Sequence, residues 1–274
     1  MMKQYMDSLV KRSSFLSYKA LLCMLQVFVG LVPAVAEEAA LDYLLFADKP
    51  GEHLEPRLME VDGDGNMYLG SRPSVYQDID PGPLTQHPEY NDDYGVVIQK
   101  FDTQGTLEWT APLSPEIHVN PNSTSIDLGA LTLGQDGYLY LGGAFSGIVD
   151  FDPGSGVHEL TSAQWNEYNW TSMYILKLDT QGNFVDVVGF NTTNGVADEK
   201  IAYPGAAIAY ALAVDSAGNM WIAGSYVNTH DFDPGENLYE LTAYDPYELD
   251  GDYIVNTFIC QLDAQRNFVW AKTF

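Results

Sequence analysis

Short runs in which apolar and polar residues alternate cover most of this chain, and turn-forming residues separate the runs. One pattern occurs three times: an apolar run, a tight turn rich in Asp, Gly and Asn, and a second apolar run. It reads LMEVDGDGNMYLG at 58–70, ALTLGQDGYLYLG at 130–142 and ALAVDSAGNMWIAG at 211–224. Alternation with period two on both sides of such a turn is typical of a β-hairpin. The sequence therefore predicts three hairpins.

A second hairpin pattern follows each of the first three. It reads VIQKFDTQGTLEW at 97–109, YILKLDTQGNFVD at 174–186 and FICQLDAQRNFVW at 258–270. In the turn, Asp can accept backbone N–H groups and Gly can adopt positive φ. Arg266 replaces that Gly in the last copy, which predicts a strained or shifted turn. Each unit thus contains four antiparallel strands.

The second strand of each unit is apolar on both faces. Met220 and Ile222 point one way and Trp221 the other, as Met67, Leu69 and Tyr68 do in the first unit. A repeated four-stranded sheet that its neighbours cover on both faces is a propeller blade. We therefore expect an all-β protein with three blades, at 56–110, 111–187 and 188–274. Because propellers usually have about four to eight blades, we expect an incomplete propeller with further blades, or an open array that self-associates.

The repeats resemble a known family over roughly residues 56–274. The motifs that carry the resemblance are ALAVDSAGNMWIAG, HDFDPG and FICQLDAQRNFVWAK in the third unit, with weaker copies in the first. They are similar to the bacterial secreted β-propeller repeats of the SBBP type. This resemblance implies an extracellular propeller and supplies no catalytic residues.

The first 36 residues differ from the rest of the chain. Basic residues precede an apolar run at 20–32, and AVA at 34–36 is followed by Glu37 and Glu38. This order predicts a secretory signal peptide at 1–36, because the apolar run is too short to span a bilayer. Segment 37–55 then contains LDYLLFA, a candidate closing strand. We expect a secreted protein, at the cell surface or outside the cell.

The charge of the remaining chain is strongly acidic. It has 8 Lys and Arg against 37 Asp and Glu, a formal net charge of −29. Nucleic acid and anionic membranes are therefore disfavoured as partners, and no membrane insertion is expected. Cys260 is the only cysteine left after residue 36 and is expected to be a core thiol.

The phrase Asp-x-Asp-Pro-Gly recurs once per unit. It appears as DIDPG at 78–82, DFDPG at 150–154 and DFDPG at 231–235. Proline ends a strand and Asp accepts backbone N–H groups, so a structural turn is the first interpretation. Two carboxylates on one side of a strand could also bind Ca²⁺ or act as an acid/base pair. The candidate calcium ligands are Asp78, Asp80, Asp150, Asp152, Asp231 and Asp233.

Strand parity places the short turns at one edge of every blade and the long connections at the other. The long connections are rich in aromatic and acidic residues, which suit a glycan or protein ligand. The alternative is that the aromatics pack the loops onto the blades. The candidate binding residues are Tyr90, Tyr94, Trp165, Tyr168, Trp170, Tyr239, Tyr244 and Tyr247.

These observations predict a non-enzymatic binding or scaffold module outside the cell. The alternative is an extracellular carbohydrate-active enzyme, a hydrolase or lyase, that uses carboxylates of the long connections. Such an enzyme needs one asymmetric carboxylate pair about 5–10 Å apart. Nothing in three similar repeats indicates such a pair.

Overall fold

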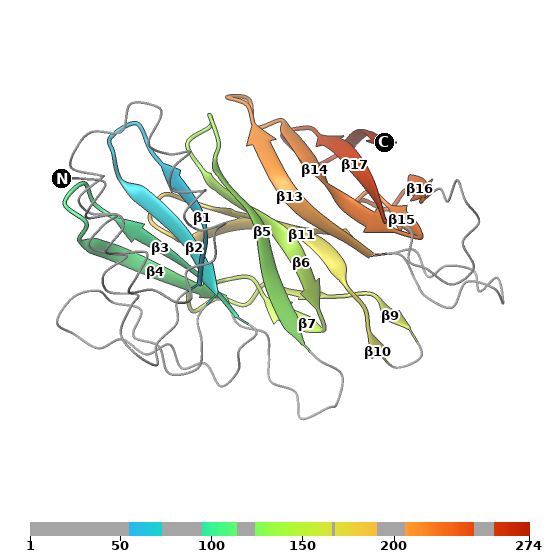
Figure 1. The fold of residues 1–274 in the computed structure, drawn as a ribbon, viewed down its shortest axis with the longest axis horizontal. Coiled ribbons are helices and arrows are strands. Elements are labelled where there is room, and N and C mark those ends of the chain that lie inside the picture. The colour runs from blue at the N-terminus through green and yellow to red at the C-terminus, as the bar shows by residue number, and fades with distance from the viewer. Residues whose placement is uncertain (1–54, 73–94, 114–123, 166–167, 191–205, 244–254) are drawn as a thin grey trace, which may run out of the picture.

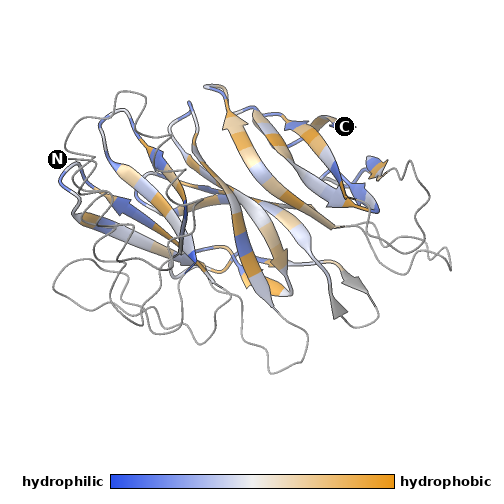
Figure 2. Cartoon of the chain, viewed as in Figure 1, coloured by the Kyte–Doolittle hydropathy of each residue, from blue (hydrophilic) through white to orange (hydrophobic). Residues whose placement is uncertain are grey.

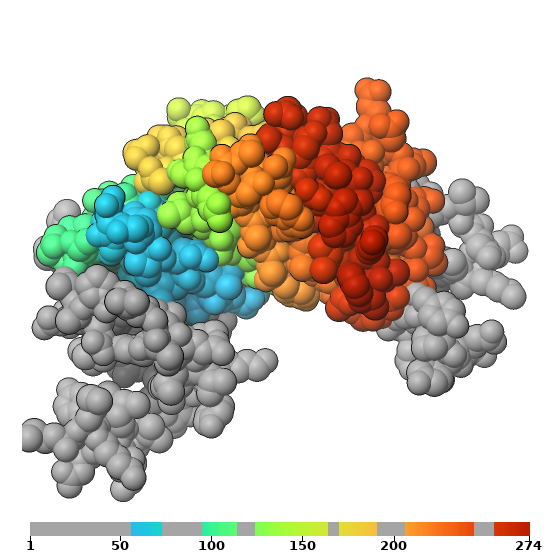
Figure 3. All heavy atoms as spheres, turned by 90° about the horizontal axis from the view of Figure 1, so that it is seen from above, coloured from blue at the N-terminus to red at the C-terminus, as the bar shows by residue number. Residues whose placement is uncertain are grey.

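The computed structural model describes residues 55–72, 95–113, 124–165, 168–190, 206–243 and 255–274. This part of the chain is all-β and contains no helix. Twelve of its strands form three four-stranded antiparallel sheets, which we call blades 1, 2 and 3. Figure 1 shows the blades side by side in chain order, and Figure 3 shows the same succession as a curved array. The predicted fold class is confirmed.

Blades 1 to 3 share one strand order. Their strands are, in blade 1, β1 (Glu55–Val61), β2 (Met67–Arg72), β3 (Val96–Phe101) and β4 (Leu107–Leu113); in blade 2, β5 (Ser125–Leu133), β6 (Leu139–Ser146), β11 (Ser172–Leu178) and β12 (Phe184–Phe190); and in blade 3, β13 (Ala206–Val214), β14 (Met220–Val227), β17 (Val255–Leu262) and β18 (Phe268–Thr273).

Three small two-stranded sheets lie in the connections between the second and third strands of blades 2 and 3. The sequence patterns placed a strand at the Asp-x-Asp-Pro-Gly phrase and loops in the rest of these connections. The returning strands and the second hairpin of blade 2 escaped prediction because strands of two or three residues leave no measurable period. They are β7 (Ile148–Asp150) with β8 (Glu159–Thr161), β9 (Gln164–Trp165) with β10 (Tyr168–Asn169), and β15 (Thr229–Asp231) with β16 (Glu240–Thr242).

The hydrophobic core fills the spaces between blades. One cluster joins blade 1 to blade 2 and includes Tyr68, Leu139 and Leu176. A second joins blade 2 to blade 3 and includes Tyr140, Met220 and Ile222. Blade 2 is therefore apolar on both faces, as the two-sided strand pattern predicts. Figure 2 shows apolar residues distributed over all three blades.

We call the face of a blade toward the preceding blade proximal, and the face toward the following blade distal. Strand β5 lies against both β1 and β13, so the first strands of the three blades are neighbours. The turns between the first and second strands and between the third and fourth strands share one edge of the array, as antiparallel pairing requires. The connections with the small hairpins leave from the opposite edge.

Candidate functional site

The Asp-x-Asp-Pro-Gly phrase forms one turn in blades 2 and 3. Asp150 Oδ1 accepts the backbone N–H groups of Asp152 at 3.0 Å and His158 at 2.8 Å. Asp152 Oδ1 accepts the N–H of Gly154 at 2.8 Å. The two carboxylates thus hold the loop between β7 and β8 in shape. Strand β7 ends at Asp150, so Asp152 lies beyond it. The expectation that both aspartates lie on the strand is therefore wrong for Asp152.

The copy in blade 3 repeats these bonds. Asp231 Oδ1 accepts the N–H groups of Asp233 at 3.0 Å and Tyr239 at 2.8 Å, and Asp233 Oδ1 accepts that of Gly235 at 2.8 Å. Desolvation by burial raises the pKa of Asp231. The copy with Asp78 and Asp80 lies outside the described residues. Within the described ranges, no three His, Cys, Asp or Glu side chains are grouped so that they could hold a metal ion.

The aromatic residue between the two aspartates anchors each hairpin to its blade. Phe151 packs against Phe145 and Tyr174, with ring centroids 5.4 and 4.9 Å apart. Phe232 packs against Tyr226 and Phe258 at 5.4 and 4.6 Å. Full burial of a Phe contributes about 1.5–3 kcal/mol. The phrase therefore recurs because in one turn two carboxylates accept backbone N–H groups and one aromatic side chain is buried against the blade.

Two of the candidate binding aromatics are described in atomic detail. Tyr239 is 39% exposed, its ring packs against Phe268 with centroids 4.4 Å apart, and its hydroxyl donates to the Ala271 carbonyl at 3.3 Å. Trp170 is half-buried, and its backbone N–H donates to the Ala163 carbonyl at 2.7 Å. Tyr239 thus packs its loop onto blade 3, as the alternative interpretation predicts.

The other candidate aromatics are described in part or not at all. The backbones of Trp165 and Tyr168 pair with each other in β9 and β10, whereas their side chains lie outside the described residues. Four further candidates lie wholly outside the described residues: Tyr90, Tyr94, Tyr244 and Tyr247. Residues 1–54, with the predicted signal peptide and closing strand, also lie outside them.

The equivalent of Tyr239 in blade 2 is His158, which the sequence did not single out. Its ring stacks on Phe184 with centroids 3.9 Å apart and an interplanar angle of 15°. Both residues follow the Asp-x-Asp-Pro-Gly turn by the same number of positions, so the alignment of repeats was the signal that could have found the pair. A ring stacked on the fourth strand is thus part of the repeat.

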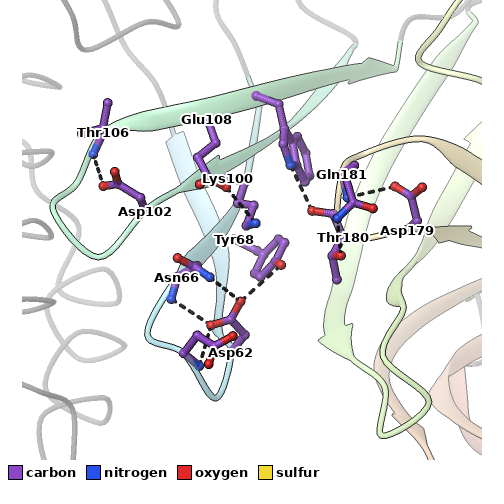
Figure 4. A network of polar contacts seen from close by, with 12 residues as sticks. Asp62, Asn66, Tyr68, Lys100, Asp102, Thr106, Glu108, Asp179, Thr180 and Gln181 are labelled. Atoms are coloured by element: carbon purple, nitrogen blue, oxygen red, sulfur yellow. Dashed lines mark hydrogen bonds and ion pairs between the residues drawn. The ribbon is translucent and has the colours of Figure 1, made fainter.

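The short-turn edge of the array has its own polar network. Asp62 Oδ1 accepts the N–H groups of Asp64 at 3.0 Å and Asn66 at 2.9 Å, and Lys100 pairs with Glu108 at 2.7 Å (Figure 4). Asp215 closes the corresponding turn of blade 3, and the amide of Asn219 that donates to it lowers its pKa. These carboxylates also serve as turn acceptors.

Contacts across the short-turn edge join neighbouring blades. The Trp109 indole Nε1 donates to the Thr180 carbonyl of blade 2 at 3.1 Å. Arg266 of blade 3 pairs with Asp186 of blade 2 at 3.3 Å. Arg266 has φ 68°, which confirms the predicted strain, yet its N–H still donates to the Asp263 carbonyl at 3.0 Å, so the turn is not shifted.

Blade 3 buries three polar side chains where blade 2 has apolar ones. Tyr226, His230 and Cys260 stand at the positions of Phe145, Val149 and Leu176, and all three are buried around Phe232. The Cys260 thiol is in the core, as predicted, and desolvation raises its pKa to about 12. Among the described residues, neither the Tyr226 hydroxyl nor either ring nitrogen of His230 has a hydrogen-bond partner.

Comparison with known proteins adds no family to these observations. No protein-family model matches the chain, and a search of curated proteins gives no match. Over the described ranges, the structure contains no helix with the length and apolar character that a membrane crossing needs.

Proposed function

We propose that this protein is a non-enzymatic scaffold that acts outside the cell or at its surface and binds a glycan through its long connections. The observation that carries this proposal is the use of the repeated carboxylates. Asp150 and Asp231 have the same two backbone donors in their two copies, at 2.8 and 3.0 Å. A repeated structural acceptor builds a regular framework, whereas a reaction centre requires one distinct constellation.

The position of the β9–β10 hairpin supports a ligand on the long-connection edge. Its backbone pairing places Trp165 opposite Tyr168, and Trp170 is the first residue after β10. Aromatic rings presented by a rigid scaffold stack against sugar rings, while neighbouring carboxylates accept sugar hydroxyl groups. The formal charge of −29 beyond residue 36 favours such a neutral, hydroxyl-rich ligand over nucleic acid or an anionic membrane.

A glycan array probed with the purified chain tests this proposal. We expect binding to at least one glycan class, and we expect the double variant Trp165→Ala and Trp170→Ala to lose at least about tenfold in affinity, as truncated aromatic anchors do. A matched control replaces Gln104 and Gln181, exposed on the short-turn edge, with Ala and should bind like the parent chain. Equal binding by the Trp variant would refute the proposed face.

A reducing-sugar assay on any bound glycan separates this proposal from the carbohydrate-active enzyme. We expect no release of reducing ends over the time in which binding is measured. Release that a carboxylate-to-amide substitution in 235–252 abolishes would establish the enzyme instead. Membership of the SBBP-type family and export through residues 1–36 remain predictions, and N-terminal sequencing of exported protein checks cleavage after Ala36.

A further inference from the structure

The two blade–blade interfaces use the same register positions with matched residues. Trp109, Asp186 and Trp270 are equivalent, because each pairs with the same position of the preceding strand. Trp109 covers the β11–β12 turn of blade 2, where a Cβ on Gly182 would approach its ring to 2.9 Å. In the next interface, Asp186 replaces the indole and Arg266 replaces the glycine. An indole thus opposes glycine, and a carboxylate opposes arginine.

A second matched position lies at the bulge of each first strand. The bulge residues are Arg57, Gly129 and Tyr210. Arg57 pairs with Asp127 of blade 2 at 3.1 Å. A Cβ on Gly129 would lie 2.1 Å from the Ala209 carbonyl oxygen, so this interface excludes any side chain. Each bulge residue therefore suits the blade that follows it.

The distal face of blade 3 has the residues of a blade interface without a described blade on it. Tyr140 and Ile175 on the distal side of blade 2 are 0% and 2% exposed. Their equivalents Trp221 and Ile259 are both partly exposed, and Tyr210 is 57% exposed. Continuity with the two existing interfaces makes this face a docking site for another blade.

The matched positions identify which blade fits. Trp270 requires glycine in the opposing turn, and Gly105 of blade 1 occupies that place, with φ 77° against 81° at Gly182. Its N–H donates to the Asp102 carbonyl at 3.0 Å, as that of Gly182 does to Asp179. Tyr210 is a hydrogen-bond donor at the bulge position where blade 1 has Arg57. Its partner position, which Asp127 occupies in blade 2, is occupied in blade 1 by Glu55, another acid. Blade 1 also has no described blade on its proximal face.

We propose that the distal face of blade 3 binds the proximal face of blade 1 of a second copy of this chain. Two copies joined head to tail in both directions form a closed ring, since a heterologous contact closes when its rotation allows. The two copies bring six of the described four-stranded blades to this ring, within the usual range of about four to eight. The inference concerns the assembly and is independent of the proposed glycan.

The receiving face determines how fast this dimer forms. Met67, Leu69 and Phe101 on the proximal side of blade 1 are at most 8% exposed in the single chain. Because these side chains are already buried in the single chain, a second blade can pack on them only after this face is uncovered. Association that requires such a rearrangement is slow, so the mass must be measured after equilibration.

Sedimentation velocity on two single variants and their mixture tests the proposal. We expect the parent chain to be a dimer, and we expect Trp270→Asp and Gly105→Arg each to dimerise at least about tenfold more weakly. In an equal mixture, one interface pairs the new carboxylate with the new guanidinium, as Asp186 pairs with Arg266. The other interface keeps Trp270 against Gly105, so the mixture should recover the dimer.

The mixture also separates assembly from folding, because two chains that failed to fold could not restore each other. Circular dichroism of each variant alone should match the parent chain. A parent chain that stays monomeric would overturn the proposal, and so would single variants that dimerise normally or a mixture that remains monomeric. A dimer that Trp270→Asp leaves intact would indicate another contact surface.

Discussion

A buried histidine makes the stability of blade 3 depend on pH. His230 in β15 is fully buried, and neither of its ring nitrogens has a hydrogen-bond partner among the described residues. Its ring contacts Phe232 edge to face, with centroids 4.8 Å apart. Desolvation lowers its pKa from 6.5 to about 3. Replacing His230 with Val, the residue at the equivalent position 149 in β7, removes this group.

The magnitude follows from the difference in proton binding between the folded and unfolded chain. Above pH 6.5 His230 is neutral in both states and adds no pH dependence. Below it, the unfolded chain binds a proton that the folded chain does not, so stability falls as the pH decreases and levels off below about 3. At about 1.4 kcal/mol per pKa unit, the loss is about 2 kcal/mol at pH 5 and approaches about 5 kcal/mol at pH 3.

Urea unfolding of the parent chain and of His230→Val between pH 8 and pH 5 measures this effect. The difference in unfolding free energy between the two should widen by about 2 kcal/mol in favour of the variant as the pH decreases. Taking the difference cancels the titration of the carboxylates that both chains share. Tyr226→Phe is a matched control, because it changes a neighbouring buried side chain and keeps His230. A difference between parent and His230→Val that stays constant with pH would refute the reasoning.

Three further changes test the packing and the turns. Tyr226→Phe should raise stability by about 1 kcal/mol in chemical denaturation, because it removes a buried hydroxyl without a described partner. Gly182→Ala should lower the unfolding free energy by at least about 2 kcal/mol, since its Cβ would meet the Trp109 ring. Gly137 has a similar φ and open space around it, so Gly137→Ala should lower it by only about 1 kcal/mol. Equal losses would contradict the contact with Trp109. Asp150→Ala should cost about 1–3 kcal/mol through two lost backbone acceptor bonds, whereas Asp150→Asn retains an acceptor oxygen and should cost less. Added Ca²⁺ should leave the melting temperature unchanged, and a rise that Asp150→Asn abolishes would assign a metal instead.

The repeat unit could be predicted from local pattern, because each strand and its turn are encoded within a few residues. The turn at 179–183 has Asp, Gly and Asn at the positions where a cap, a positive φ and a closing amide are needed. The aspartates of 150–154 could be interpreted as a turn for the same reason. Their second interpretation, calcium, stayed open because a sequence does not show which backbone N–H groups a carboxylate accepts.

Side-chain partners that are distant along the chain could not be predicted, even within one blade. Tyr239 appeared as a candidate binding residue, yet its ring packs on Phe268, a residue 29 positions later. Similarly, the sequence did not predict a ring contact for His158, although its ring stacks on Phe184. Both contacts depend on where the loop returns to the fourth strand, which the number of loop residues does not determine.

By itself, the sequence determined that the chain makes four-stranded antiparallel units and where their turns lie, because hydrophobic alternation and turn residues act over short distances. Only the tertiary structure decided which residues meet between units: Trp109 with Thr180 and Gly182, and Asp186 with Arg266. These pairs are 71 or more residues apart in the two interfaces, and they form only when one blade packs on the next. The physical reason is that burial and side-chain complementarity are properties of the packed array and not of any single strand.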